Sequence, residues 1–187
     1  EMFADTEVKA IICSNGGYGT GRIAADLDYD LIRRNPKIFW GYSDITFLHT
    51  SIRQKSGLVT FHGPMLSSDI GKETWSDVSA HFISQLFNNK AVVYDESIAP
   101  METPISGQAQ GELVGGNLCL IVSTLGTPYE IETKGKILLI EDIHEEPRSV
   151  DRMLNQLWMA GKLQHIAGLV VGDFNDCGPA ERQQSLT

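Results

Sequence analysis

Lys37-Ile38-Phe39-Trp40-Gly41-Tyr42-Ser43-Asp44-Ile45-Thr46 is the stretch that decides the fold. Its apolar first half predicts a buried strand, and an amphipathic helical pattern follows at once, with apolar residues at Ile45, Leu48 and Ile52. Ser43 is therefore expected on the corner between a strand and a helix. A serine there projects its hydroxyl from the end of a sheet, beside the first free N–H groups of the helix.

Two interpretations of Ser43 stay open at this point. Serine and aspartate are common helix N-caps, so Ser43 or Asp44 could simply accept hydrogen bonds from the first turn of the helix. The alternative is a nucleophilic serine, which needs an exposed corner of this kind. The surrounding Gly-Tyr-Ser-Asp differs from the Gly-x-Ser-x-Gly pattern of the common hydrolase elbow, so the rest of the chain must decide.

A glycine-rich loop precedes this corner. Residues 8–14 predict a short buried strand that runs into Asn15-Gly16-Gly17-Tyr18-Gly19-Thr20-Gly21-Arg22. The glycine spacing matches neither the dinucleotide-binding motif nor the P-loop, so no nucleotide cofactor is expected. The loop is either a plain turn or a set of backbone N–H groups that face an oxyanion or a substrate carboxylate.

The elements around the loop and the corner predict a parallel sheet of the α/β class. Residues 23–34 predict one or two short helices broken at Leu27-Asp28, and residues 58–62 predict a strand after a helix that Gly57 ends. Strand, helix, strand, helix, strand is typical of a parallel sheet with crossover helices. Ligands bind such sheets beyond the carboxyl ends of the strands, where the glycine loop and Ser43 both fall.

The chain as a whole is expected to contain parts of two domains. Residues 1–66 form part of an N-terminal domain that carries Ser43, and residues 107–187 form part of a C-terminal domain. Between them, residues 67–106 predict a connector with one amphipathic helix, marked by Trp75, Val78, Phe82 and Leu86.

Three acidic residues mark strand ends in the C-terminal part. Residues 136–140 predict a buried strand that ends in Glu141-Asp142, and residues 169–172 predict another that ends at Asp173. Helices are expected over residues 118–125, directly after Gly115-Gly116-Asn117, and from Pro147 onward. Carboxylates at the end of an apolar strand are unfavourable unless they are paired, solvated or functional, and these readings stay open.

Composition and charge exclude several classes of function. The 187 residues carry 15 Lys and Arg against 24 Asp and Glu, a formal net charge of −9, which argues against a nucleic-acid partner. No apolar stretch is long enough for a membrane span and no signal-peptide pattern opens the chain, so a cytoplasmic protein is expected. The three cysteines predict buried free thiols. No metal is expected, because no two histidines have the spacing of a metal pair on one helix face.

None of the five histidines stands out as a catalytic base. A serine hydrolase of the triad type needs an imidazole that takes the serine proton and a carboxylate that orients the imidazole. His49 lies about one and a half turns into the helix after Ser43, where it could not easily reach back. His62 could lie on the rim of the sheet, whereas the others lie on a polar helical position or on loops: His81, His144 and His165. For each of the five, a satisfied or solvated side chain is the favoured interpretation.

Together these motifs resemble the serine LD-carboxypeptidase family, which includes the self-immunity peptidases that inactivate microcin C. The resemblance covers nearly the whole chain, with several motifs in the family order. They are Gly16-Gly17-Tyr18-Gly19 with Arg22, Asn35-Pro36-Lys37, Gly41-Tyr42-Ser43-Asp44, His62-Gly63-Pro64-Met65, Gly115-Gly116-Asn117-Leu118, Gly126-Thr127-Pro128, Glu141-Asp142, Asp151-Arg152-Met153-Leu154 and residues 168–174.

The resemblance implies a Rossmann-like, parallel-sheet N-terminal domain and a smaller, β-rich C-terminal domain. It makes Ser43 the nucleophile, Glu141 the carboxylate that orients the histidine, and the N–H groups of Gly17 and Asp44 the oxyanion donors. The triad histidine of the family follows the last matched strand, in a Gly-His motif that this chain lacks, and further elements precede the first matched residue. We therefore expect an internal portion that lacks both ends of the protein and is inactive by itself.

The expected function of the full-length protein is that of a serine carboxypeptidase. It would cut an L,D peptide bond and release the terminal D-alanine of murein tetrapeptides during cell-wall recycling. The near alternative is an immunity peptidase that acts on a peptidyl-nucleotide, with Trp75 as the candidate platform for the base, although its helical pattern favours core packing. A third reading is a non-catalytic binding module. A small peptide substrate and a homodimer are implied, with no cofactor.

Overall fold

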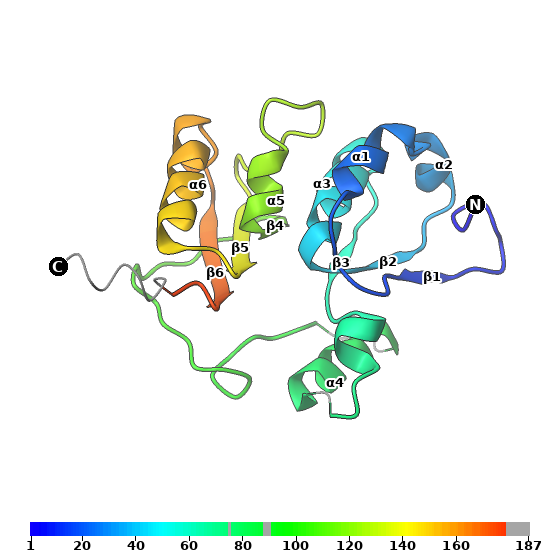
Figure 1. Cartoon of the computed structure of the whole chain (residues 1–187), viewed down its shortest axis with the longest axis horizontal. Helices are drawn as coiled ribbons and strands as arrows, with labels where there is room; N and C mark the ends of the chain where they lie inside the picture. Colours follow the sequence, from blue (N-terminus) through cyan, green and yellow to red (C-terminus); the bar gives the residue numbers. More distant parts are fainter. Residues whose placement is uncertain (75, 88–90, 179–187) are drawn as a thin grey trace.

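The computed structural model describes residues 1–74, 76–87 and 91–178. It contains two parallel sheets, one in each half of the chain (Figure 1). The first has the order β1-β2-β3, from Ala10–Ile12, Ile38–Gly41 and Phe61–His62; the second has the order β4-β5-β6, from Leu113–Asn117, Ile137–Ile143 and Gly168–Asn175. Both sheets carry helices between successive strands, which confirms the predicted α/β class.

The helices of the first half follow the sequence pattern, except that the first one begins at Thr20, inside the segment predicted as a glycine-rich loop. They are α1 (Thr20–Ile23), the 3₁₀ turn η1 (Ala24–Asp26), α2 (Tyr29–Arg34), the 3₁₀ turn η2 (Ser43–Ile45) and α3 (Thr46–Ser56). The predicted break at Leu27-Asp28 is present, because the carboxylate of Asp28 accepts the Leu31 N–H at 2.8 Å and starts α2 there. Gly57 ends α3 in the left-handed conformation, as predicted.

The strands of the first sheet are shorter than the apolar runs suggested. The expected strand over residues 58–62 pairs with β2 only at Phe61 and His62, and Val59 is 69% exposed. An apolar run indicates burial more than it indicates pairing, so it overestimates a strand at the edge of a sheet. The core beneath the sheet is formed by Ile32, Phe39, Ile45, Leu48, Ile52 and Met65.

The segment between the two sheets holds η3 (Leu66–Ile70, a single π-helical turn), α4 (Asp77–Ser84) and the 3₁₀ turn η4 (Gln85–Phe87). The predicted amphipathic helix is therefore present, although Trp75 lies outside the described residues. Residues 91–112 form neither helix nor strand, and Figure 1 shows them as an open path from α4 to β4. The division into segments 1–66, 67–106 and 107–187 stays a prediction.

The second sheet is covered by α5 (Leu118–Ser123) and α6 (Pro147–Met159), which pack with it around Leu118, Ile121, Leu138 and Leu157. One expectation is wrong here, because β5 and β6 continue through the acids at which they were expected to end. The strand β4, which includes Gly115-Gly116-Asn117, was not predicted. Glycine has a low strand propensity, which hid β4 from the pattern.

The cysteines are free thiols, as expected, but they are not all buried. Cys119 is exposed on α5 because Leu118 and Ile121 take the inward face of that helix. Cys13 and Cys177 are partly buried. Among the described residues, no helix has the length and apolar character to cross a membrane.

The two halves meet along α3, which lies beside α5 in Figure 1. The hydroxyl of Thr46 accepts the N–H of Asn117 at 3.1 Å, in a buried contact between α3 and β4. Further along α3, the Gln54 side chain donates to the Glu130 carbonyl and accepts the Glu132 N–H, at 3.1 and 2.8 Å. These bonds bring the carboxyl ends of the two sheets to a common junction.

Candidate active site

Ser43 sits on the corner between β2 and α3 in a conformation that serine rarely adopts. Its φ is +63°, in the left-handed region, where a residue with a Cβ is strained by about 1–3 kcal/mol. The N-cap of η2 is Tyr42, and no side chain caps this turn. The cap interpretation therefore does not apply to Ser43, because its strained backbone presents the hydroxyl without tying it to the helix start.

Asp44 does not cap its own helix either. Its side chain is buried and accepts the N–H of Thr20 at 3.1 Å, while the Thr20 hydroxyl donates to the Asp44 carbonyl at 2.6 Å. These two bonds tie the start of α1, and with it the end of the glycine loop, to the residue after Ser43. The loop and the corner are thus one assembly.

The glycine loop lies directly against Ser43. A Cβ added to Gly16 would lie 2.8 Å from Ser43 Oγ and 3.7 Å from the Asp44 nitrogen. Gly17 follows with a φ of +146° and open space where a side chain would be. The loop backbone therefore borders the serine hydroxyl with a free face at Gly17, which is the environment that a pair of oxyanion donors requires.

The two acids of β5 have different surroundings. Asp142 is 4% exposed, and its carboxylate accepts hydrogen bonds from Asn117 Nδ2, the Cys119 N–H and the Ile143 N–H, at 2.7 to 2.9 Å. Glu141, one residue earlier, has a buried oxygen, Oε1, that no hydrogen bond in the described part of the chain satisfies. Asp142 is therefore a structural acid that holds the start of α5, and Glu141 is the acid free for chemistry.

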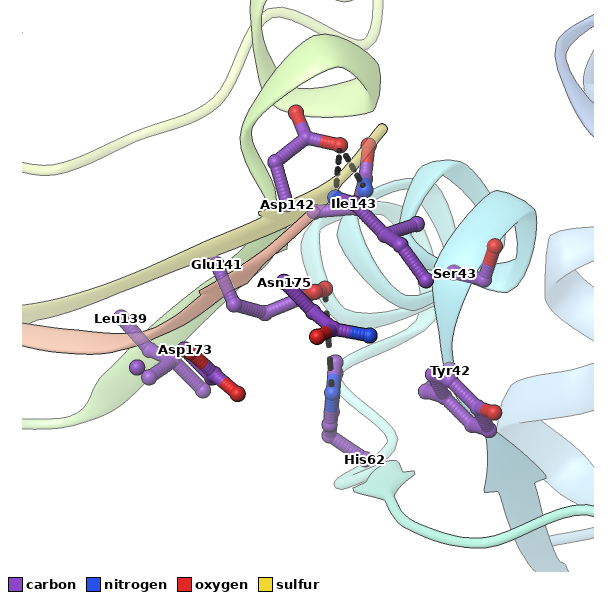
Figure 2. Close-up of a pocket in the computed structure, with 11 residues that line it drawn as sticks. Tyr42, Ser43, His62, Leu139, Glu141, Asp142, Ile143, Asp173 and Asn175 are labelled. Atoms are coloured by element: carbon purple, nitrogen blue, oxygen red, sulfur yellow. Dashed lines mark hydrogen bonds and ion pairs between the residues drawn. The ribbon is translucent and has the colours of Figure 1, made fainter. Parts of the chain in front are cut away.

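A cavity of about 410 Å³ joins these features across the junction of the two halves. Ser43 and Tyr42 line it from the first half, and Glu141 lines it from the second (Figure 2). The remaining lining residues are His62, Asn117, Leu139, Asp142, Ile143, Gly172, Asp173 and Asn175. Residues 98 positions apart in the sequence, Ser43 and Glu141, therefore share one pocket.

Burial changes the protonation of the acid in this pocket. Desolvation, followed by the nearby Asp142, raises the pKa of Glu141 to about 7. His62 approaches this carboxylate, with its Nε2 4.0 Å from Glu141 Oε1. Desolvation, with a smaller effect of His49, lowers the pKa of His62. At neutral pH the site therefore holds a neutral imidazole beside a carboxyl group that is close to its titration point.

His49 lies beneath the pocket. It is 7% exposed, and its Nε2 lies 2.8 Å from the Gly41 carbonyl at the end of β2, to which it donates. Burial lowers the pKa of His49 to about 4, although the bond to the Gly41 carbonyl opposes this. It braces the strand end before Ser43 and forms no hydrogen bond with the serine among the described residues, in agreement with its expected place in the helix.

No histidine forms a hydrogen bond with Ser43 in the described residues, which include all five histidines. His81, His144 and His165 are exposed and lie outside the pocket. His62 was given little weight by sequence reasoning, and its signal was its position at a strand end on the same rim as Ser43. Sequence reasoning also did not assign to the site several other residues that line the pocket, among them Tyr42, Asn117 and Asn175.

Asp173 lines the same cavity from β6 with an exposed side chain. Its position at the carboxyl end of the sheet agrees with the sequence pattern, and solvation is sufficient to explain it. In the described part of the chain, no three His, Cys, Asp or Glu side chains gather in an arrangement that could hold a metal ion.

Comparison with known proteins matches both halves of the chain to one family. Residues 1–63 match the LD-carboxypeptidase N-terminal domain, and residues 110–187 match the LD-carboxypeptidase C-terminal domain. A probable murein peptide carboxypeptidase of Bacillus subtilis (strain 168) is 59% identical over 187 residues, which are 100% of this chain and 59% of that protein.

Two solved structures share the fold at substantial identity. The muramoyltetrapeptide carboxypeptidase from Oxalobacter formigenes is 31% identical with a TM-score of 0.83, over 100% of this chain and 62% of that one. The MccF-like protein from Bacillus anthracis str. Ames is 34% identical with a TM-score of 0.81, over 94% of this chain and 60% of that one. The chain therefore spans 59–62% of the length of these relatives.

Proposed function

Because the chain belongs to the LD-carboxypeptidase family, we propose that the full-length protein is a serine carboxypeptidase that hydrolyses an L,D peptide bond. Its substrate is a murein tetrapeptide, from which it releases the terminal D-alanine. The similarity to the Bacillus subtilis and Oxalobacter formigenes proteins supports this substrate class. The observation that carries the proposal is the strained, uncapped Ser43 in one pocket with Glu141, whose buried Oε1 has no hydrogen-bond partner among the described residues.

The proposed reaction uses the residues of this pocket in sequence. Ser43 Oγ attacks the scissile carbonyl, and the N–H groups of Gly17 and Asp44 stabilise the oxyanion that forms. An imidazole takes the serine proton and returns it to the leaving D-alanine amine, and Glu141 holds that imidazole in the correct tautomer. The family resemblance assigns this imidazole to a histidine outside the 187 residues. Water then hydrolyses the acyl-enzyme by the same steps.

The near alternative is a peptidase that acts on a peptidyl-nucleotide. The similarity to the MccF-like protein of Bacillus anthracis favours it. The aromatic residue considered for stacking on the base, Trp75, lies outside the described residues. Parallel assays of the full-length protein with a murein tetrapeptide and with an aspartyl-adenylate analogue would separate the two substrates by their kcat/KM values.

The experiment that tests the proposal is D-alanine release by the full-length protein and by its Ser43→Ala variant. The parent should release D-alanine, and the variant should lose nearly all of this activity, because binding and the oxyanion hole alone support little turnover. Retained activity in the variant would refute the nucleophile. Labelling by a fluorophosphonate distinguishes a binding module: an enzyme is labelled at Ser43, whereas a module binds ligand without labelling or turnover.

A cytoplasmic location, which was expected from the sequence patterns, and a homodimer, which the resemblance implies, are further proposals. Cell fractionation and analytical ultracentrifugation of the full-length protein test them independently of activity.

A further inference from the structure

His62 faces the buried carboxylate of Glu141 across the junction of the two halves. Its Nε2 lies 4.0 Å from Glu141 Oε1, and Figure 2 shows the two side chains pointing toward each other. We propose that His62 is a positioning residue for Glu141. Its Nε2–H group holds one carboxylate oxygen and leaves the other free for the catalytic imidazole. This inference rests on the proposed function, because it assigns His62 a role through the triad carboxylate.

The surroundings of Glu141 leave this role to His62. Glu141 Oε1 is buried and has no hydrogen-bond partner among the described residues, and His62 is the basic side chain within ion-pair distance of it. The neighbouring Asp142 shows the contrast, because three donors hold its carboxylate. A carboxylate that must orient an imidazole needs such restraint, because a misplaced carboxylate fails to fix the tautomer.

His62 is itself held in place from several sides. Its residue pairs with Gly41 in the ladder between β2 and β3, so it lies beside the strand end that leads to Ser43. Its ring centroid lies 5.9 Å from that of Tyr42 and 6.3 Å from that of His49. A Cβ on Gly116 of β4 would lie 3.0 Å from His62 Nδ1. The imidazole is therefore contacted from several sides although its side chain is 29% exposed, and its Nε2 lies toward Glu141.

The 4.0 Å separation is longer than a hydrogen bond. Catalytic contacts in unliganded sites are often long and shorten when the substrate binds, so this spacing suits a contact that closes during turnover. The contact also links the two halves, because His62 belongs to the sheet that carries Ser43 and Glu141 belongs to the other. His62 thereby sets the position of the acid relative to the nucleophile.

The charges around the pair predict how its loss would change the pH profile. Glu141 faces Asp142 on its own strand, Asp173 on β6 across the cavity, and Tyr42 and His62 from the first half. His62 also has His49 behind it. Without His62, the carboxylate keeps only acidic or neutral neighbours. Its ionised form is then less favoured, and the acid limb of the kcat/KM profile should move to higher pH.

The test compares His62→Leu and His62→Gln in the full-length protein, with His165→Gln as a matched control at an exposed position. His62→Leu should lower kcat by about tenfold to a hundredfold with little change in KM, and shift the acid limb upward. His62→Gln keeps an N–H donor near the position of Nε2, so it should recover much of kcat and the parental acid limb. His165→Gln should match the parent in all three measurements.

Two outcomes separate this inference from the proposed function. If Ser43→Ala is inactive but His62→Leu keeps the parental kcat and acid limb, the positioning role is wrong and the serine mechanism stands. If Ser43→Ala stays active, the serine mechanism itself fails. Should His62→Leu not fold, NMR of the imidazoles decides. Glu141→Gln should move the ring signals of His62 and leave those of His165 in place, and unmoved His62 signals would overturn the proposal.

Discussion

At the scale of single residues, the position of the Ser43 hydroxyl depends on a glycine at position 16. Ser43 holds a left-handed φ of +63°, and Gly16 lies where any side chain would strike its hydroxyl, with 2.8 Å between the added Cβ and Oγ. Strained serines of this kind persist where the surrounding structure holds them, and here the bonds between Asp44 and Thr20 do so. Gly16 carries no side chain, and this leaves space for the hydroxyl of Ser43.

Gly16→Ala should therefore damage catalysis more than stability. The backbone of Gly16 is outside the left-handed region, so alanine fits its conformation, but its Cβ must push Ser43 Oγ aside. A displacement of about 1 Å can cost about a hundredfold in kcat. Gly107→Ala is the control, because nothing lies within 4 Å of the added Cβ. D-alanine release and thermal unfolding of both full-length variants check this, and equal kcat values would contradict it.

Substitution of Glu141 and substitution of Asp142 should change the free energy of unfolding in opposite directions. The pKa of Glu141 is raised from 4.5 to about 7. Between these pH values the folded protein keeps a proton on Glu141 that the unfolded chain releases. This favours folding at low pH, and the benefit is lost as pH rises from about 4.5 to 7. In the chain described here, Glu141→Gln should therefore add about 2–3 kcal/mol to the free energy of unfolding at pH 8, and progressively less toward pH 4.5.

Asp142→Ala provides the comparison for the Glu141 variant. It removes the acceptor of three hydrogen bonds and leaves the buried amide of Asn117 and the partly buried N–H of Cys119 without this partner, so it should lower the free energy of unfolding by about 3 kcal/mol. Urea unfolding at pH 5 and pH 8 measures both variants. A Glu141→Gln variant that is less stable than the parent at pH 8 would contradict the reading of Glu141 as an unpartnered buried acid.

At the scale of elements, the contact between β4 and α3 fixes the position of the two sheets relative to each other. Gly116 of β4 has a φ of +133°, and a Cβ there would lie 2.7 Å from Thr46 Oγ1 and 3.0 Å from His62 Nδ1. The close approach of β4 to α3 therefore requires glycine. This close approach also explains why glycine occurs at position 116 within a strand.

Gly116→Ala should open this junction and lower both stability and kcat. Gly126→Ala separates the clash from the backbone effect, because Gly126 also has a positive φ but has open space around it. Gly126→Ala should lose about 1 kcal/mol from backbone strain alone, and Gly116→Ala should lose clearly more. Thermal unfolding of the two variants measures the difference, and equal losses would show that the junction tolerates a side chain.

The sequence predicted most elements whose pattern is local. The helix after Ser43, the break at Leu27-Asp28 and the helix from Pro147 follow from periodicity, capping and proline, which act within a few residues. It did not predict β4, because Gly115 and Gly116 resemble a turn until Thr46 and His62 are seen beside them. The edge strand β3 was overestimated because pairing depends on a distant partner.

The residues of the candidate site also fall into those that a local pattern predicts and those that depend on distant partners. Ser43 and Glu141 were marked by their places at strand ends, which is a local signal. The different environments of Glu141 and Asp142 could not be predicted, since the donors to Asp142 come from Asn117 and α5, about two dozen residues earlier. The approach of His62 to Glu141 depends on how the two sheets meet, which no pattern within either half contains.

At the scale of the whole molecule, the described residues include Ser43, Glu141 and all five histidines, and no imidazole among them is hydrogen-bonded to Ser43. We predict that the 187-residue chain alone does not release D-alanine, whereas the full-length protein does. Removal of one triad member leaves only a small residual rate. Side-by-side assays of the two proteins, with circular dichroism to compare their folding, check this. Release by the short chain at the rate of the full-length protein would contradict it, and would make His62 the first base to examine.

The left-handed backbone of Ser43 also implies a trade-off between thermal stability and activity. Glycine adopts this conformation without strain, whereas alanine keeps the Cβ that causes it. The inactive Ser43→Gly variant should therefore melt at a higher temperature than the inactive Ser43→Ala variant, with a difference of about 1 kcal/mol in the free energy of unfolding. A thermal melt of the two variants measures it. If Ser43 is the proposed nucleophile, a substitution that stabilises this corner against heat is one that removes the reacting hydroxyl.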